Sequence, residues 1–160
     1  MAGCRPPALG YLMVELPDLV IAESATGVLG RLRSVGMMVV ITHPERNPVM
    51  QGKIDMLRKW VEDGCMLQVT GQSLLGRFGL EAERCASALM KQDLVHFIAS
   101  DAHDCQYRPP RLDESRRHIA KRYGVERADR LCTINPGKVL AGEPLESAVV
   151  QERKWYRFWE

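Results

Sequence analysis

Four short apolar runs recur along the chain, and a longer segment of mixed polarity separates each from the next. The runs cover 11–14, 37–42, 66–70 and 95–99. Continuously apolar runs of this length are typical of strands buried on both faces, as in a parallel sheet. His43 and Pro44 end the second run, because proline cannot continue a central ladder.

The segments between and after these runs carry apolar residues at helical spacing. We expect helices over 21–34, 53–62, 80–91 and 113–123, then two shorter ones at about 127–132 and 136–140. Gly36 and Gly64 follow the first two and provide C-terminal stops. This alternation predicts an α/β fold with a parallel sheet covered by helices. Periodicity leaves open whether the sheet is doubly wound or closes as a barrel.

The composition indicates one soluble globular domain, with 46% hydrophobic and 26% charged residues in a chain of 160. The net charge of +2 gives no argument for nucleic-acid binding. No apolar run approaches the roughly 20 residues of a membrane span. We expect 1–10 to be an irregular lead-in without the apolar core of a signal peptide, and 143–160 to be a tail. The aromatic end of that tail either docks on the fold or contacts a partner.

The five cysteines are scattered and form no C-x-x-C pair. This argues against a disulfide framework and a zinc ribbon, and favours a reducing cytoplasm. Cys105 lies close in sequence to Asp101 and His103, which makes a thiol nucleophile one alternative. A spare reduced thiol is the simpler interpretation.

Residues that can bind metals stand at the ends of three of the four predicted strands. Glu15 ends the first, His43 follows the second, and Asp101 and His103 follow the fourth. Because the carboxyl ends of parallel strands meet at one edge of the sheet, we expect these four side chains to converge there. Mixed histidine and carboxylate ligation suits zinc, manganese or iron.

Each of these residues has a plainer interpretation when taken alone. Glu15 fits a solvated loop residue, His43 a turn, and Asp101 a helix or turn cap. The case therefore depends on their combination. The other two histidines do not share the pattern: His96 lies within a strand and fits a packed core position, whereas His118 lies on a charged, solvated helix.

Two arginines follow the candidate ligands. Arg46 comes three residues after His43, and Arg108 comes five after His103. A guanidinium group presents a rigid fork of donors that matches a phosphate. Arginines beside a metal site are what phosphoester hydrolysis requires, because they neutralise the developing charge.

Several motifs together resemble one known family. The string ITHPERN at 41–47 resembles the HPER segment of the PHP phosphatases of the CpsB/CapC type, and FIASDAH at 97–103 with Arg108 resembles their SDAH motif and its trailing arginine. Weaker matches are YLMVELP at 11–17, LQVTGQS at 67–73 with Gly76 and Gly79, and Asn135-Pro136 with Gly142. The resemblance extends over about 11–142.

The resemblance implies a distorted TIM-like barrel of seven strands that holds a cluster of manganese, iron or zinc ions. It assigns Glu15, His43, Asp101 and His103 to metal-ligand positions, and Arg46 and Arg108 to phosphate-binding positions. The implied activity is hydrolysis of tyrosine phosphate in proteins, with a bacterial tyrosine kinase that controls polysaccharide export as the substrate. Residues 11–142 would form the C-terminal part of the barrel domain.

The chain also departs from the family pattern. It has no H-x-H motif, and we predict four strands rather than seven, whereas such a barrel needs roughly 200 residues or more. A fragment, a misplaced start or a degenerate copy would each explain this, and incomplete ligation predicts impaired activity. Alternatives are another PHP activity, such as histidinol-phosphate hydrolysis or exonucleolytic editing, or an inactive remnant that only binds a partner.

Overall fold

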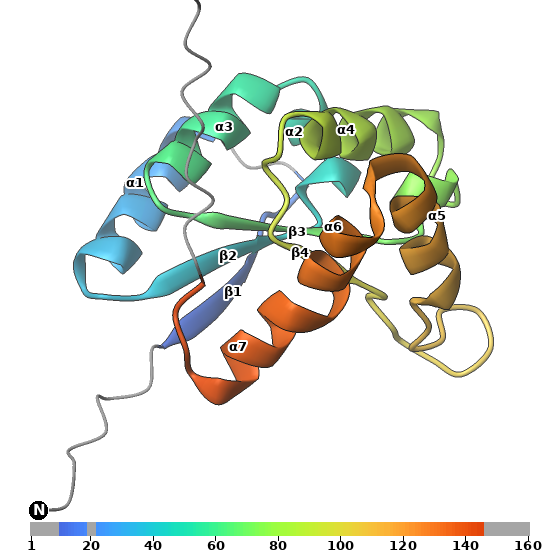
Figure 1. Ribbon diagram of the computed structural model, residues 1–160. Helices are drawn as coiled ribbons and strands as arrows, with labels where there is room; N and C mark the ends of the chain where they lie inside the picture. Colours follow the sequence, from blue (N-terminus) through green and yellow to red (C-terminus); the bar gives the residue numbers. More distant parts are fainter. Residues whose placement is uncertain (1–9, 19–21, 146–160) are drawn as a thin grey trace, which may run out of the picture.

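The computed structural model describes residues 10–18 and 22–145 and contains four parallel strands (Figure 1). They are β1 (Tyr11–Glu15), β2 (Met38–Thr42), β3 (Met66–Thr70) and β4 (Phe97–Ala99). Each strand pairs in parallel with its predecessor in the chain, in the order β1-β2-β3-β4. The predicted parallel α/β fold is confirmed, although the last strand begins at Phe97 rather than at residue 95.

The main helices lie close to the predicted ranges. They are α1 (Ala22–Ser34), α3 (Ile54–Glu62), α4 (Leu80–Lys91) and α5 (Asp113–Tyr123). Three short elements were not predicted, because one-turn helices carry no readable hydrophobic period: η1 (Pro44–Arg46), α2 (Pro48–Gln51) and η2 (Ser73–Leu75).

The two separate short helices expected near the C-terminus are instead one continuous run. It consists of α6 (Val125–Asp129), the π-helical turn η3 (Arg130–Ile134) and α7 (Asn135–Ala141). Pro136 does not break it, because it lies in the first turn of α7, where a missing N–H is tolerated.

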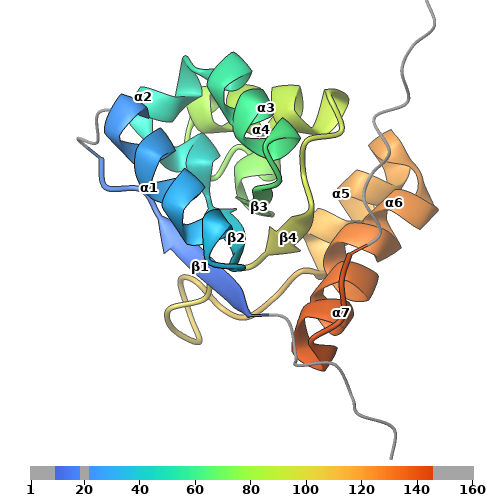
Figure 2. The same ribbon diagram turned by 90° about the vertical axis from the view of Figure 1, so that its left-hand side faces the viewer.

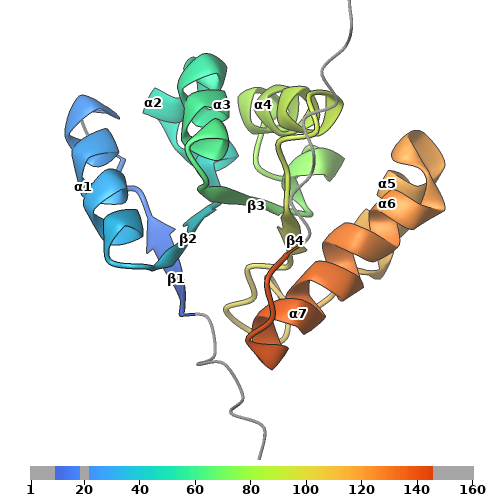
Figure 3. The same cartoon turned by 60° about the vertical axis from the view of Figure 1, so that its left-hand side comes forward.

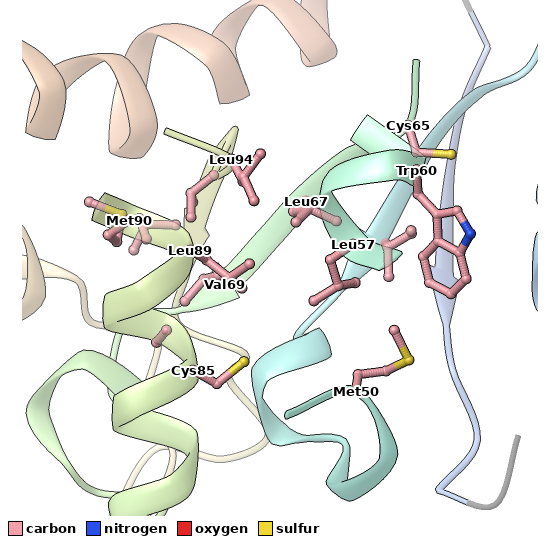
Figure 4. Packing of buried hydrophobic residues seen from close by; sticks show 14 of the residues in the cluster. Met50, Leu57, Trp60, Cys65, Leu67, Val69, Cys85, Leu89, Met90 and Leu94 are labelled. Atoms are coloured by element: carbon pink, nitrogen blue, oxygen red, sulfur yellow. The ribbon is translucent and has the colours of Figure 1, made fainter. Parts of the chain in front are cut away.

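The helices are arranged around the sheet in two groups. Helices α1 to α4 cover one face, and α5, α6 and α7 pack together beside β4 (Figures 2 and 3). The covered face contains the main core, in which side chains from β2 and β3 such as Ile41, Leu67 and Val69 pack against Leu57 and Trp60 of α3 and Leu89 of α4. Figure 4 shows this packing around Leu57, Leu67 and Leu89.

The opposite face of the sheet holds a smaller apolar cluster. Val40, Met66 and Phe97 point to this face, and Val139 of α7 packs against them. Alternate residues of each strand thus serve the two faces, as strand geometry requires. The sheet is open in the described part of the chain, since β1 and β4 pair only on one side. Its sequential strand order matches a section of barrel wall and lacks the reversal of a doubly wound sheet.

Gly71 lets α5 pack tightly against the end of β3. A Cβ atom at Gly71 would lie 2.5 Å from Ser115 Oγ and 2.7 Å from Ser115 Cβ. These distances are too short for any other residue to be accommodated without a shift of α5. The start of α5 is therefore held close to the carboxyl edge of the sheet.

The predicted lead-in and the predicted tail with its aromatic end lie almost entirely outside the described residues. Residues 143–145 are described, and the carbonyl of Glu143 accepts a 2.7 Å hydrogen bond from Tyr11 Oη on β1. Among the described helices, none has the combined length and apolar character that crossing a bilayer demands.

Candidate metal and phosphate site

The candidate residues lie at the carboxyl edge of the sheet. Glu15 pairs in register with Thr42, and the next residue, His43, continues the ladder by donating its backbone N–H to the Gln68 carbonyl at 2.8 Å. On the other side of β3, Gly71 N–H donates to the Ala99 carbonyl at 2.9 Å, two residues before Asp101. Adjacent strands thus deliver the candidates to one edge, as the sequence suggested.

The structure brings the four candidate ligands together as two pairs. His43 Nε2 lies 3.5 Å from Glu15 Oε1, with the His43 side chain only 16% exposed and that of Glu15 72% exposed. His103 Nδ1 lies 3.9 Å from Asp101 Oδ1 and 2.9 Å from the carbonyl oxygen of Asp101.

Two of these residues have strained backbones. His43 has φ of 34° and Asp101 has φ of 51°, and among the described non-glycine residues only Asp93 shares this left-handed region. Such a conformation costs a non-glycine residue on the order of 1–3 kcal/mol and is concentrated at functional sites. The strain turns the chain sharply after β2 and β4, so that both side chains remain at the edge of the sheet.

Arg46 and Arg108 meet at Asp101. A terminal nitrogen of each guanidinium group donates to the same carboxylate oxygen, Asp101 Oδ2. All three side chains are partly buried, which strengthens their electrostatic interaction relative to a pair in water. Two arginines from different loops therefore reach a single oxygen of one anion.

Phe78, which sequence reasoning missed, supports both arginines. The Arg46 guanidinium carbon lies 4.2 Å from the centre of the Phe78 ring, and that of Arg108 lies 5.7 Å from it. Stacking of a guanidinium group on an aromatic face is favourable and restricts the fork. Gly76 and Gly79, with φ of 75° and 87°, flank Phe78. In the sequence, these two glycines were the only indication of the loop that holds it.

Glu45 was also missed, although it lies inside the HPER string. Its side chain is fully buried, and Oε1 accepts hydrogen bonds from Thr70 N–H at 2.9 Å and Ser73 Oγ at 2.8 Å. Oε2 has no partner among the described residues. Burial raises the pKa of Glu45 to about 7, against the lowering effect of these hydrogen bonds and of Arg46. Glu45 therefore ties η1 to the end of β3 and to η2.

The four candidate ligands have donor atoms that suit a divalent ion, but their side chains come together only two at a time. Histidine and carboxylate donors suit zinc, manganese or iron. No group of three or more His, Cys, Asp or Glu side chains in the described ranges is positioned to hold one ion, and the Asp101 carboxylate is engaged by two guanidinium groups. The metal roles of Glu15, His43, Asp101 and His103 remain predictions.

Two of the described cysteines, Cys85 and Cys132, are unsuited as nucleophiles. Burial raises the pKa of Cys85 to about 12 and that of Cys132 to about 11, so both stay protonated at neutral pH. Cys105 is exposed on the loop after β4. His96 is half-buried and directly precedes β4, so the prediction that it lies within the strand was wrong; its Nδ1 lies 3.2 Å from the Leu67 backbone nitrogen.

A parallel sheet with sequential strands and polar side chains at its carboxyl edge is the arrangement found in β/α-barrel enzymes. A family model described as "Capsular polysaccharide synthesis, CpsB/CapC" matches residues 8–141. The chain therefore belongs to the CpsB/CapC family, in agreement with the resemblance of its HPER and SDAH motifs.

Individual relatives agree with this assignment. The chain is 35% identical over 99 residues to a CapC protein of Staphylococcus aureus, covering 62% of this chain and 39% of that protein. It is 33% identical over 116 residues to the tyrosine-protein phosphatase YwqE of Bacillus subtilis, covering 72% of this chain and 46% of YwqE. It is 29% identical over 117 residues to the tyrosine-protein phosphatase CpsB of Streptococcus pneumoniae, covering 70% and 48%.

The fold is similar as well. A solved structure from the pair YwqE of Bacillus subtilis and CpsB of Streptococcus pneumoniae, described as metal-dependent tyrosine phosphatases, matches with a TM-score of 0.78 and 31% identity. The match covers 85% of this chain and 55% of the solved one. The chain thus spans about half the length, or less, of the relatives it matches. The comparisons lend no support to the histidinol-phosphatase alternative.

Proposed function

We propose that the chain takes part in metal-dependent hydrolysis of phosphotyrosine in proteins. Membership of the CpsB/CapC family and similarity to proteins named tyrosine-protein phosphatases support this. The observation that carries the proposal is the convergence of Arg46 and Arg108 on one oxygen of Asp101. Two guanidinium groups that can share a carboxylate oxygen can also share an oxygen of a phosphate.

In this proposal the arginines bind and orient the phosphoryl group. Their forks neutralise charge on its oxygens as the bond to the tyrosine oxygen breaks, and Phe78 limits their motion before substrate arrives. Glu45 fixes the position of η1, and with it the starting point of the Arg46 side chain. Preorganised donors are effective because they need little rearrangement during the reaction.

Glu15, His43, Asp101 and His103 are the proposed metal ligands. A divalent ion, when bound, activates water for attack and withdraws charge from a phosphoryl group. Manganese, iron and zinc all accept these donors. Because the described candidates form pairs only, we expect weak metal binding and slow turnover by these 160 residues.

The proposed physiological substrate is a tyrosine-phosphorylated protein, with a bacterial tyrosine kinase as the leading candidate. The link to capsular polysaccharide synthesis in the family description supports a role in regulating that process. We also propose a cytoplasmic location, with which the free thiols of Cys65, Cys85, Cys105 and Cys132 are compatible.

The test combines a binding measurement with an activity measurement. Arg46→Ala and Arg108→Ala should each lower kcat/KM for a phosphotyrosine peptide in the presence of Mn²⁺ by roughly 10²–10³-fold, the usual loss when one transition-state donor is removed. Both should also weaken the binding of inorganic phosphate, measured by calorimetry without metal. Arg58→Ala is the matched control, because Arg58 is an exposed arginine paired with Asp55 on α3.

The proposal fails if phosphate does not bind the unaltered chain, or if both arginine variants bind it as well as the Arg58→Ala control. For the metal, His43→Ala and His103→Ala should each weaken Mn²⁺ binding in the same calorimeter, whereas His118→Ala should not. Equal Mn²⁺ affinity in all three variants would contradict the proposed ligands.

A further inference from the structure

A cavity of about 250 Å³ is lined by residues that adjoin Phe78 and Arg108 in the sequence. Its walls come from the two loops that position the pair: Arg77 precedes Phe78, while Tyr107 and Pro109 flank Arg108. The start of α5 closes the third side with Ser115. The cavity and Arg108 thus share one loop.

The floor of the cavity is polar. Gln72 and Ser115 both line it, and each is almost fully buried. The close packing of Ser115 on Gly71 fixes the depth of this floor. Buried polar groups favour a ligand that can hydrogen-bond, because an apolar one would leave them unpaired.

The charged residues that line the cavity do not all have an ion-pair partner among the described residues. Arg77 pairs with Glu114 at 2.5 Å, and Asp113 pairs with Arg117 at 3.1 Å. The Arg117 hydrogen bond is the main reason for the lowered pKa of Asp113, and the charge of Arg111 adds to it. Arg111 itself is exposed and makes no ion pair with any carboxylate in the described ranges.

We propose that this cavity is a subsite for an acidic side chain adjacent to the phosphotyrosine, with Arg111 as its cation. The proposal rests on the proposed function, since it concerns the same substrate. An aspartate or glutamate in the cavity gains the unpaired fork of Arg111 and hydrogen bonds from the polar floor. A lysine there would have to compete with Arg77 or Arg117 for its carboxylate partner.

Three fluorescein-labelled peptides test the proposal. Each has one phosphotyrosine flanked on both sides by glutamate, by alanine or by lysine. Their binding is measured by fluorescence anisotropy without divalent metal, so that no turnover interferes. The unaltered chain should bind the glutamate peptide roughly tenfold more tightly than the lysine peptide, in the range of a single charge-assisted contact.

The test depends on the ratio of the affinities for the glutamate and lysine peptides, measured within each variant. A general loss of structure would weaken the binding of both peptides and leave this ratio unchanged. Arg111→Gln should bring the ratio close to one, and Arg111→Glu should favour the lysine peptide. Arg84→Gln is the matched control and should keep the ratio, because Arg84 is an exposed arginine on α4 paired with Glu81.

The outcomes separate the two proposals. If inorganic phosphate competes with all three peptides but the chain does not discriminate between them, the subsite is wrong and the phosphate site stands. If the preference for glutamate persists in Arg111→Gln and Arg111→Glu, Arg111 is not the cation and the subsite proposal is overturned. If no peptide binds and phosphate does not bind either, both proposals fail.

Discussion

The segments 43–47 and 100–108 each bring one arginine to the same carboxylate, but they are stabilised in different ways. In the first, Glu45 and Asn47 are buried and make contacts distant in sequence: Glu45 accepts from Thr70 and Ser73, and Asn47 Nδ2 donates to the Leu16 carbonyl at 3.2 Å. In the second, residues 102–107 are exposed and the bonds are local.

The local bonds of the second segment centre on Asp104. Its Oδ1 accepts from the backbone N–H groups of Gln106, Tyr107 and Arg108 at 2.7, 2.5 and 3.1 Å. These bonds are the main reason for the lowered pKa of Asp104. Arg46 thus extends from a segment anchored in the core, whereas Arg108 extends from a loop that depends on its own turn. Arg46, a rigidly held donor, and Arg108, a more adaptable one, thus contact the same Asp101 carboxylate.

The largest effect is expected at Glu45. Glu45→Ala removes the acceptor of Thr70 N–H and Ser73 Oγ and leaves a cavity, so the free energy of unfolding should fall by about 3 kcal/mol. Glu45→Gln keeps one oxygen acceptor and should lose about 1 kcal/mol. Urea denaturation measures both.

Glu62→Ala is the matched control for this experiment, because Glu62 is exposed at the end of α3 and its loss should change stability by less than roughly 0.5 kcal/mol. If Glu45→Ala were as stable as Glu62→Ala, the first segment would not depend on its buried carboxyl, and the contrast between the two segments would disappear.

A smaller effect is expected at Asp104, and on a different property. Asp104→Ala removes the acceptor that three backbone N–H groups share, so Arg108 should be less well positioned. Phosphate affinity should fall roughly tenfold, because a modest misplacement of a binding group is costly. The urea midpoint should barely move, since the loop is exposed and packs little of the core.

Asp104→Asn keeps the Oδ1 acceptor and should retain the phosphate affinity of the unaltered chain. The idea of a locally supported loop is wrong if Asp104→Asn loses as much affinity as Asp104→Ala, or if the two variants unfold at lower urea concentration. Together with the Glu45 variants, the two Asp104 variants distinguish an arginine held by contacts with the core from one held by the hydrogen bonds of its own turn.

The same contrast explains what the sequence could predict. His43 directly follows one apolar run and Asp101 follows another after Ser100, so their place at one edge of a parallel sheet followed from strand direction alone. The shared contact of Arg46 and Arg108 with Asp101 did not follow, because it depends on side-chain reach across two loops. Glu45 reads as an ordinary surface glutamate, and only tertiary packing reveals that it is buried.

The sheet illustrates a similar limit. The apolar runs predicted parallel strands, but they could not separate a doubly wound sheet from a barrel, because both bury strands on two faces. Strand order resolves part of this question, since each strand lies beside its predecessor. That order depends on long-range pairing, which local periodicity does not encode.

The smallest effect concerns His96, which directly precedes β4 and lies between the two segments in the sequence. Nδ1 accepts from Leu67 N–H at 3.2 Å and also lies 3.0 Å from the Leu94 carbonyl, so protonation of Nδ1 would exchange the first bond for the second. Burial lowers the pKa of His96, with Arg130 adding to this and Asp93 and the Leu94 carbonyl opposing it.

The direction of the pH effect follows from this lowering. Above the usual pKa of 6.5 the histidine is neutral in both states, and its contribution to stability is fully present. As the pH falls below 6.5 the unfolded chain takes up the proton first, so stability is lost until the pH passes the lowered pKa of the folded state. Because His96 takes up only one proton, the free energy of unfolding cannot fall on its account by more than about 1.4 kcal/mol per pH unit.

His96→Gln removes this titration, so the comparison should be made between the unaltered chain and the variant rather than on either alone. Glu45, with its raised pKa, contributes its own slope, which cancels in the difference. The free energy of unfolding of the unaltered chain should fall relative to that of His96→Gln as the pH is lowered from 7 to 5. His118→Gln provides the control, and His118 is a half-buried residue of α5. A difference that stays constant over this range would mean that His96 takes up its proton equally easily in the folded and unfolded chain, and that its burial before β4 carries no electrostatic cost.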